Sequence, residues 1–168
     1  TVNPIKEITS RAHQVGARVF VDAVHFAPHR LMHFDMWDID FLACSTYKFF
    51  GPHLGVLCGK RNLLEQLPVY KVRPSPETVP DRWMTGTQSY EAIAGAHAAV
   101  SYLAALGKHL VPESQTRREC LVNAYAGISA HEQSLVIELL ERLMAMPEVQ
   151  IYGVTSPDDM HLRLPTVL

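Results

Sequence analysis

The sequence predicts an α/β fold, and the order of its apolar runs carries that prediction. Apolar residues at helical spacing over 4–15 precede a short, almost wholly apolar run that ends at Asp22, as in a strand buried on both faces of a parallel sheet. Two further apolar runs, over 39–45 and 54–58, complete an order of helix and strands typical of α/β domains. We therefore expect a mostly parallel sheet with flanking helices.

The second half of the chain predicts long helices. Residues 63–83 contain several prolines and should be irregular, whereas 89–106 form an alanine-rich helical pattern. A longer helical pattern covers 112–146, and its length is typical of a helix that joins two domains. Beyond it, 149–153 and 162–168 resemble strands.

These patterns divide the chain into three parts. We expect residues 1–111 to be the end of a large domain, 112–147 a connecting helix, and 148–168 the start of a smaller α+β domain. The chain has no initiating methionine and stops inside a predicted strand, so we expect it to be an internal piece of a longer protein.

Composition places the chain among ordinary globular proteins. Its 168 residues are 48% hydrophobic and 19% charged, with a net charge of −2 and no basic cluster, so we expect no nucleic-acid partner. No apolar run approaches the length of a membrane span. Cys44, Cys58 and Cys120 form no CxxC pair and predict no metal site, and we interpret them as reduced core thiols of a cytoplasmic protein.

A carboxylate and a lysine follow the first two predicted strands. Asp22 ends the first strand, and Lys48 lies just past the end of the second. A pyridoxal phosphate enzyme requires this pair, because the lysine forms an imine with the aldehyde and the carboxylate keeps the ring nitrogen protonated. Each residue alone has a simpler reading, Asp22 as a turn residue and Lys48 as a sheet-edge lysine.

The residues around the pair favour the same interpretation. Tyr47 and the two following phenylalanines should partly desolvate Lys48, which favours the neutral, nucleophilic amine. Ser45 and Tyr47 offer hydroxyls for a phosphate, and His25 lies within reach of the phenolic oxygen of such a cofactor. Any single histidine among the nine in this chain could equally be a surface residue.

Two stretches carry a family resemblance. Residues 21–25 (VDAVH) and 45–48 (STYK) resemble the class V aminotransferase group of fold-type I pyridoxal phosphate enzymes, and in particular kynureninases and isopenicillin-N-epimerase-like proteins. Residues 48–57 (KFFGPHLGVL) and 82–88 (RWMTGTQ) are similar to cysteine desulfurase-like proteins. The resemblance covers about residues 1–110 and implies part of a pyridoxal phosphate transferase large domain.

The resemblance also implies a role for each matching residue. Lys48 would be the Schiff-base lysine and Asp22 the partner of the ring nitrogen, with His25 near the ring oxygen. Ser45 and Tyr47 would contact the phosphate. Thr87, in a Gly-Thr turn at a helix start, would reach the phosphate of the neighbouring subunit's cofactor, which implies a homodimer.

The chain departs from the desulfurase pattern in several places. Cysteine desulfurases carry Gln where His25 stands and His where Tyr47 stands. Their nucleophilic cysteine belongs to a later loop, and their glycine- and threonine-rich phosphate loop precedes the segment matched here. We therefore expect this chain to hold only half of a cofactor site.

Several functions remain open from the sequence. A cysteine desulfurase-like C–S lyase or sulfur-transfer reaction on a small amino acid leads, and a kynureninase- or epimerase-like reaction is the alternative. Arg73, Arg82 and Arg163 are candidates to hold the substrate carboxylate, although each could be a solvated surface charge. An inactive scaffold is a further alternative, which the presence of both Asp22 and Lys48 disfavours. A nucleotide-binding domain is disfavoured because no GxGxxG or GxxxxGK[ST] motif occurs.

Overall fold

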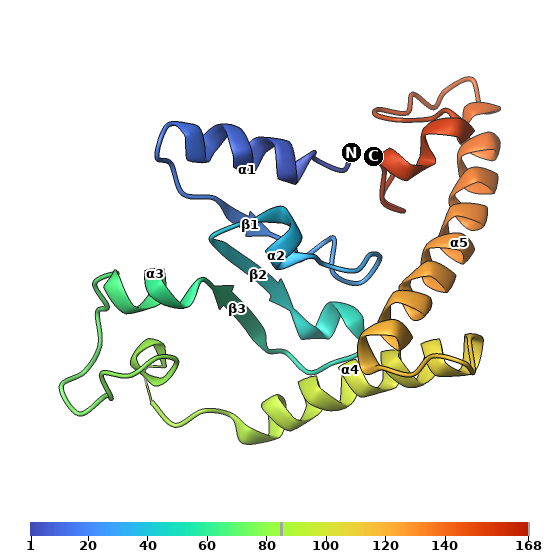
Figure 1. The fold of residues 1–168 in the computed structure, drawn as a ribbon. Helices are drawn as coiled ribbons and strands as arrows, with labels where there is room; N and C mark the ends of the chain where they lie inside the picture. Colours follow the sequence, from blue (N-terminus) through green and yellow to red (C-terminus); the bar gives the residue numbers. More distant parts are fainter. Residues whose placement is uncertain (85, 168) are drawn as a thin grey trace. The chain divides into compact units, whose positions relative to one another are not determined.

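A computed structural model describes residues 1–84 and 86–167 (Figure 1). The chain divides into two compact units. The unit that we call the sheet unit comprises Lys6–Val24 and His33–Ala99. The unit that we call the helical unit comprises Thr1–Ile5, His25–Met32 and Val100–Leu168.

The sheet unit contains a three-stranded sheet in the order β1-β2-β3. Strand β1 (Phe20–Asp22) runs parallel to β2 (Phe41–Ser45), and β2 runs antiparallel to β3 (Gly55–Gly59). The α/β class is confirmed, but the strand directions within this chain are mixed. The cause is the short connection over 46–54, because parallel neighbours need a longer crossover.

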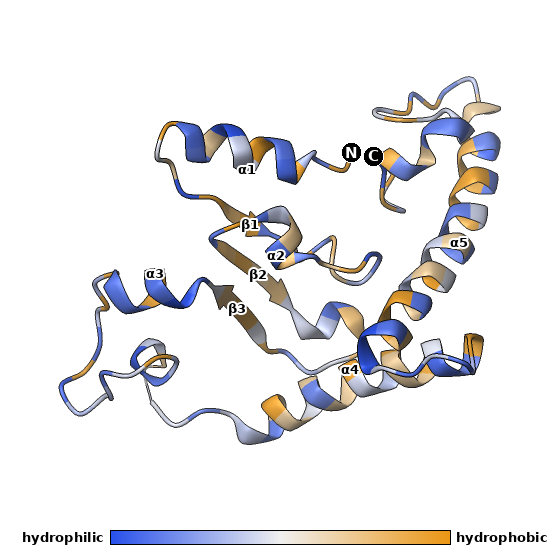
Figure 2. Cartoon of the chain, viewed as in Figure 1, coloured by the Kyte–Doolittle hydropathy of each residue, from blue (hydrophilic) through white to orange (hydrophobic). Residues whose placement is uncertain are grey.

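Alternation along β2 gives the sheet one buried face. Leu42 and Cys44 are buried, whereas Phe41, Ala43 and Ser45 on the other face are half-buried. The strands are hydrophobic along their length, as Figure 2 shows. The other large core residues of this unit are Ile39, Phe49 and Leu63.

Short helices flank the strands. Helix α1 (Ile5–Gln14) precedes β1, α2 (Phe34–Trp37) precedes β2, and α3 (Arg61–Gln66) follows β3. A 3₁₀ helix η1 (Thr46–Phe49) carries Lys48, and another, η2 (Asp81–Trp83), interrupts the proline-rich stretch. That stretch is therefore less irregular than expected, because α3 and η2 lie within or beside it.

Helix α4 (Tyr90–Leu110) confirms the alanine-rich helix and contributes to both units. In the sheet unit, Ala99 is buried and Gly95 lies against Pro52, where an added Cβ would come within 3.1 Å of the proline ring. The small side chains thus allow the first half of α4 to approach the turn that carries Lys48.

The helical unit is built on α5 (Arg117–Met144). Thr116 and Glu119 form a capping box, so the helix begins five residues later than the pattern from 112 predicts. Near the other end, α5 packs against the 3₁₀ helix η3 (Pro157–Leu162) through a core of Val136, Leu140 and Met160.

Two of the predicted elements are wrong. Residues 149–153 and 162–167 form no strand, and η3 occupies part of the interval, while Leu168 lies outside the described residues. Their apolar side chains instead pack on α5, where Ile151, Val154 and Val167 contact its core. The domain boundaries at residues 111 and 147 stay a prediction. No helix in the described part of the chain is long and apolar enough to cross a membrane.

Candidate functional site

The parallel pair of strands brings Asp22 and the lysine turn to one edge of the sheet. Asp22 is the last residue of β1, Ser45 is the last residue of β2, and η1 with Lys48 follows β2 directly. Both strands run in the same direction, so these residues meet at their carboxyl ends. Open α/β sheets bind ligands outside this edge.

Strand register also places Asp22 and Ser45 on one face. Asp22 pairs with Ala43, and Ser45 lies two residues beyond Ala43 on β2. Residues two apart on a strand share a face, and Phe20 and Phe41 stack on this same face with ring centroids 6.2 Å apart. The acid and the hydroxyl therefore project from the same side of the sheet.

The Asp22 carboxylate is exposed, and one of its two oxygens accepts a hydrogen bond from a described residue. Its Oδ1 accepts a hydrogen bond of 2.9 Å from the Val24 N–H, which fixes the carboxylate at the start of the turn after β1. Among the described residues, its Oδ2 accepts no hydrogen bond. One oxygen is thus held in place while the other can meet a ligand.

Lys48 is exposed, contrary to the expected partial desolvation. Its Nζ lies 5.1 Å from the centroid of the Tyr47 ring and forms no ion pair with any described residue. The cause is the local geometry of η1, since Phe49 is buried below the turn while Phe50 points out to solvent with 73% exposure. Within the described part of the chain, no carboxylate forms an ion pair with this amine.

Thr46 holds the lysine turn together. Its side chain is buried, and its Oγ1 donates to the Pro52 carbonyl at 2.6 Å and lies 3.2 Å from the Leu54 carbonyl. Its N–H donates to Leu54 O, and its carbonyl accepts from the Gly51 N–H, both at 2.9 Å. A Cβ on Gly51 would lie 2.8 Å from Thr46 Cβ, so the turn closes only with glycine there.

The remaining predicted site residues lie in different places. Thr87 is exposed in the sheet unit, between Gly86 and the first turn of α4, while Thr85 of the same motif lies outside the described residues. Ser89 Oγ accepts a hydrogen bond of 3.4 Å from Ala92 N–H at the start of α4. His25 is exposed and belongs to the helical unit, where it lines a hollow with Tyr152 and Arg163.

Two of the three arginines proposed to hold a substrate carboxylate donate instead to backbone carbonyls of this chain. Arg163 is buried, not a solvated charge, and donates to the carbonyls of Val154 and Thr166. Arg82 donates to Glu65 O at 2.7 Å. Arg73 is exposed, and its guanidinium forms no hydrogen bond or ion pair with a described residue, so it remains a candidate.

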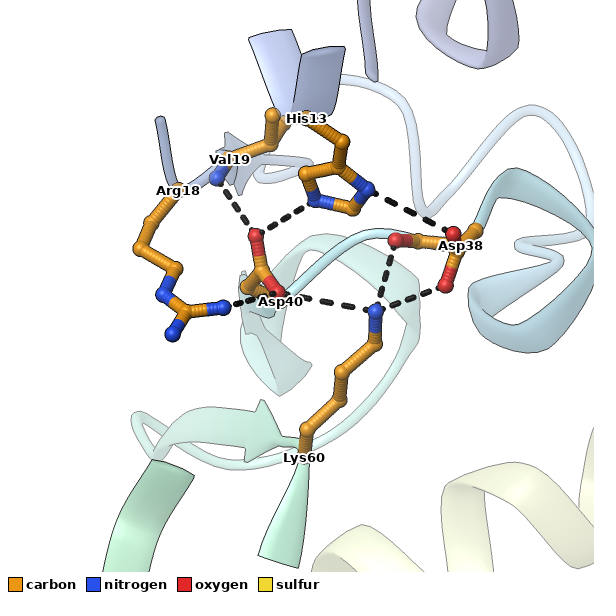
Figure 3. A network of polar contacts seen from close by, with 6 residues as sticks. All are labelled: His13, Arg18, Val19, Asp38, Asp40 and Lys60. Atoms are coloured by element: carbon orange, nitrogen blue, oxygen red, sulfur yellow. Dashed lines mark hydrogen bonds and ion pairs between the residues drawn. The ribbon is translucent and has the colours of Figure 1, made fainter. Parts of the chain in front are cut away.

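A second polar cluster, which the sequence does not reveal, lies at the opposite edge of the same sheet (Figure 3). Asp40 precedes β2 and is almost fully buried, with 1% exposure. Its Oδ2 accepts hydrogen bonds from the Val19 N–H at 2.8 Å and from His13 Nε2 at 2.9 Å. Its Oδ1 lies 3.5 Å from Lys60 Nζ and 3.9 Å from the Arg18 guanidinium.

Contacts within this cluster shift the pKa values of Asp40 and Lys60. Burial raises the pKa of Asp40, but the hydrogen bonds from His13 and Val19 and the charge of Lys60 outweigh it, so its pKa lies below the ordinary value. The hydrogen bond to Asp38 raises the pKa of Lys60. Because the cluster joins the end of α1 to the start of β2 and the end of β3, we interpret it as a structural network.

The cysteines divide by exposure. Cys44 and Cys120 are buried as expected, whereas Cys58 on the edge strand β3 is exposed. Burial raises the pKa of the Cys44 and Cys58 thiols, and the nearby Asp35 raises that of Cys58 further. Raised values leave little thiolate at neutral pH, so neither thiol is suited to act as a nucleophile.

The chain is similar in sequence to known proteins over most of its length. The aminotransferase-like protein FGM3 of Gibberella zeae is 32% identical over 99% of this chain, and a cysteine desulfurase of Dickeya dadantii is 33% identical over 91%. The chain spans 38% and 36% of these two proteins, respectively.

Solved structures of cysteine desulfurases share the fold. The apo enzyme from Thermococcus onnurineus NA1 superposes on 98% of this chain with a TM-score of 0.73 and 20% identity, and the chain covers 39% of that enzyme. CsdA from Escherichia coli matches 84% of the chain with a TM-score of 0.60 and 26% identity, and 34% of CsdA is covered. The class-V aminotransferase profile matches residues 1–164, and the chain therefore belongs to the class-V aminotransferase family.

Proposed function

We propose that this chain is the part of a pyridoxal 5′-phosphate-dependent enzyme that supplies the lysine and the acid of the cofactor site. The observation that carries the proposal is the parallel β1–β2 pair, which brings Asp22 and the Lys48 turn to the carboxyl edge of one sheet. Its residues fit the cofactor, because the Lys48 amine has no carboxylate partner among the described residues and Asp22 keeps one oxygen without a hydrogen bond.

Each residue has a distinct task in this proposal. When bound, the cofactor supplies an electron sink for carbanion chemistry. Lys48 Nζ would be the nucleophile that holds the cofactor aldehyde, and once the substrate amine has displaced it, the freed amine would move a proton at the substrate's α carbon. Asp22 would partner the ring nitrogen and would favour its protonated state.

The phosphate and the ring oxygen are assigned to the surrounding polar groups. We assign the phosphate to Ser45 and Tyr47, which lie at the end of β2 and in η1. Thr87, just before the N-terminus of α4, is assigned to the phosphate of a neighbouring subunit, which requires a homodimer. His25 is assigned to the ring oxygen.

We infer a cysteine desulfurase-like reaction on a small amino acid as the leading chemistry of the whole enzyme. Similarity to several cysteine desulfurases supports it. Sulfur transfer would need a reactive thiol, and we assign it to another part of the enzyme, because Cys44 and Cys120 are buried and the pKa of the exposed Cys58 is raised. A kynureninase- or epimerase-like reaction is the alternative, which His25 and Tyr47 favour because desulfurases carry Gln and His there.

Covalent trapping of the cofactor tests the proposal. The full-length protein is mixed with pyridoxal 5′-phosphate, reduced with borohydride and digested, and the modified peptide is identified by mass spectrometry. We expect a visible absorbance band before reduction and the cofactor attached to Lys48 afterwards, both lost in Lys48→Ala and kept in Lys6→Ala, a change at another exposed lysine. Attachment to a different lysine, or no band, would refute the proposal.

A product assay then separates the two reaction classes. Release of sulfide or persulfide sulfur together with alanine from cysteine supports desulfurase-like chemistry. Cleavage of kynurenine or epimerisation of an amino acid, without sulfur release, supports the alternative.

A further inference from the structure

The Tyr47 ring has two close neighbours within the lysine turn. The imidazole of His53 stacks on it with ring centroids 5.0 Å apart and an interplanar angle of 15°. Lys48 Nζ lies over the same ring at 5.1 Å from its centroid. The Lys48 amine and the His53 imidazole therefore both contact the Tyr47 ring.

Thr46 makes this stack possible. Tyr47 belongs to η1, and His53 lies six residues later, in the connection to β3. The Thr46 hydroxyl and the Gly51 N–H close the loop between them, so the two rings face each other across the turn.

Burial does not hold the Tyr47 ring in place. Tyr47 is 44% exposed, and His53 is also exposed. An exposed tyrosine samples several rotamers, and each moves its hydroxyl by several ångströms because the oxygen sits at the far end of the ring. A parallel neighbouring ring restricts this motion and stabilises one orientation.

We propose that His53 is a positioning residue, which holds the Tyr47 ring so that the Tyr47 hydroxyl meets the cofactor phosphate. The inference rests on the function proposed above, and it gives a role to a residue to which that function assigns none. His53 acts through the ring of Tyr47, so its effect should appear only when the ligand has a phosphate.

Two ligands separate this role from a general effect on the site. Pyridoxal 5′-phosphate and pyridoxal share the ring and the aldehyde, and only the first has the phosphate. We expect His53→Ala to raise the dissociation constant of pyridoxal 5′-phosphate by about 2- to 10-fold, the range for loss of one aromatic pair. The dissociation constant of pyridoxal, measured in the same way by fluorescence titration of the full-length apo protein, should not change.

Rescue and control variants sharpen the test. His53→Phe keeps a stacking ring and should restore cofactor affinity, whereas His53→Gln keeps polarity without the ring and should behave like His53→Ala. His97→Ala removes another exposed histidine of the sheet unit and should have no effect on either ligand. Thermal unfolding of each apo variant checks that the fold is intact.

A double-mutant cycle links His53 to the tyrosine hydroxyl. Tyr47→Phe removes the hydroxyl and keeps the ring, so it should weaken pyridoxal 5′-phosphate binding by itself. In that background, His53→Ala should have no further effect, because the group that it positions is gone. Independent effects of the two changes would overturn the inference.

The remaining outcomes are also decisive. Equal weakening of both ligands, or none, in His53→Ala would overturn the role of His53 and leave the proposed function standing, provided that the unchanged protein binds the cofactor at Lys48. An unchanged protein that binds no cofactor would refute both proposals together.

Discussion

At the scale of single residues, Thr46 contributes more to the lysine turn than its neighbour Lys48. The Lys48 amine lies over the Tyr47 ring. Thr46, in contrast, uses its N–H, its carbonyl and its hydroxyl to bond Leu54, Gly51 and Pro52 on the other side of the turn. A buried hydroxyl that donates to a carbonyl stabilises the fold, although the Pro52 carbonyl also accepts a hydrogen bond from the Leu54 N–H. The position of the nucleophile therefore depends on a residue that takes no part in the chemistry.

Replacing Thr46 by valine tests this dependence. Thr46→Val keeps the branched shape and removes the donor to Pro52 O, so the free energy of unfolding should fall by about 0.5–1.5 kcal/mol, the net contribution of one hydrogen bond. Cofactor trapping at Lys48 should slow in the same variant. Thr46→Ser keeps the hydroxyl and loses one methyl, for a cost of about 0.8 kcal/mol. Chemical denaturation compares the two, and a Thr46→Val variant as stable as the unchanged protein would show that the hydroxyl does not matter.

At the scale of elements, α4 and α5 come into backbone contact within the helical unit. A Cβ added to Gly107 of α4 would lie 1.7 Å from the carbonyl oxygen of Cys120 and 2.8 Å from the Ala124 nitrogen, both in α5. Neither atom can move without displacing a helix. Gly107 is therefore required by the close approach of the two helices.

Gly107→Ala should separate the helices. Alanine normally stabilises a helix interior by about 1 kcal/mol relative to glycine, but here the clash should reverse the sign and cost more than about 3 kcal/mol. Gly127→Ala on α5 is the matched control, because its Cβ would meet only the flexible end of the Leu110 side chain. Thermal unfolding should show a large drop for Gly107→Ala and little change for Gly127→Ala, and similar drops would contradict the packing argument.

Local patterns in the sequence predicted the elements that local chemistry determines. The strands ending at Asp22 and Ser45, the third strand and both long helices are confirmed as elements. The expected burial of the strands on both faces is wrong, since alternate residues of β2 are buried but most residues of β1 and β3 are exposed. The start of α5 was also readable, since Thr116 and Glu119 have the spacing of a capping box. The strands predicted after α5 are wrong because the apolar residues there pack on a helix. A short apolar run does not distinguish a strand from a loop that packs on a helix.

The site was predictable only in part. Asp22 and Lys48 follow strand ends, so their shared edge could be inferred from the order of elements alone. The roles of Thr46 and Asp40 depend on hydrogen bonds to residues whose positions the tertiary fold sets, and no pattern of residue types marks them. Exposure of Lys48 was missed for the same reason, because neighbouring aromatic residues do not reveal which way they point.

At the scale of the whole molecule, the two units differ in the buried charge that each contains. The helical unit contains Arg163, which donates to backbone carbonyls. The sheet unit contains Asp40, a carboxylate that can be neutralised by acid. Acid should therefore weaken the sheet unit through Asp40.

The directions of the Asp40 and Lys60 pKa shifts determine how stability changes with pH. The pKa of Asp40 is lower in the folded protein than in the unfolded chain, so its stabilisation is fully present above about pH 4 and is lost as the pH falls through the folded value. The pKa of Lys60 is raised, so its stabilisation is present below about pH 10 and is lost at higher pH. Between these limits the charges of Asp40 and Lys60 themselves stay constant.

Asp40→Asn should remove the acid-sensitive part of this contribution. At pH 7 the free energy of unfolding should fall by about 1.5–3 kcal/mol, because charge-assisted hydrogen bonds from His13 and Val19 are lost. The difference between the variant and the unchanged protein should shrink below about pH 4, where Asp40 itself becomes neutral. Asp38→Asn alters the exposed carboxylate of the same network, where solvent screens the charge, and should cost less than Asp40→Asn. Urea denaturation from pH 3 to pH 8 measures all three proteins, and a difference for Asp40→Asn that stays constant over this range would show that the buried carboxylate is not the acid-sensitive group.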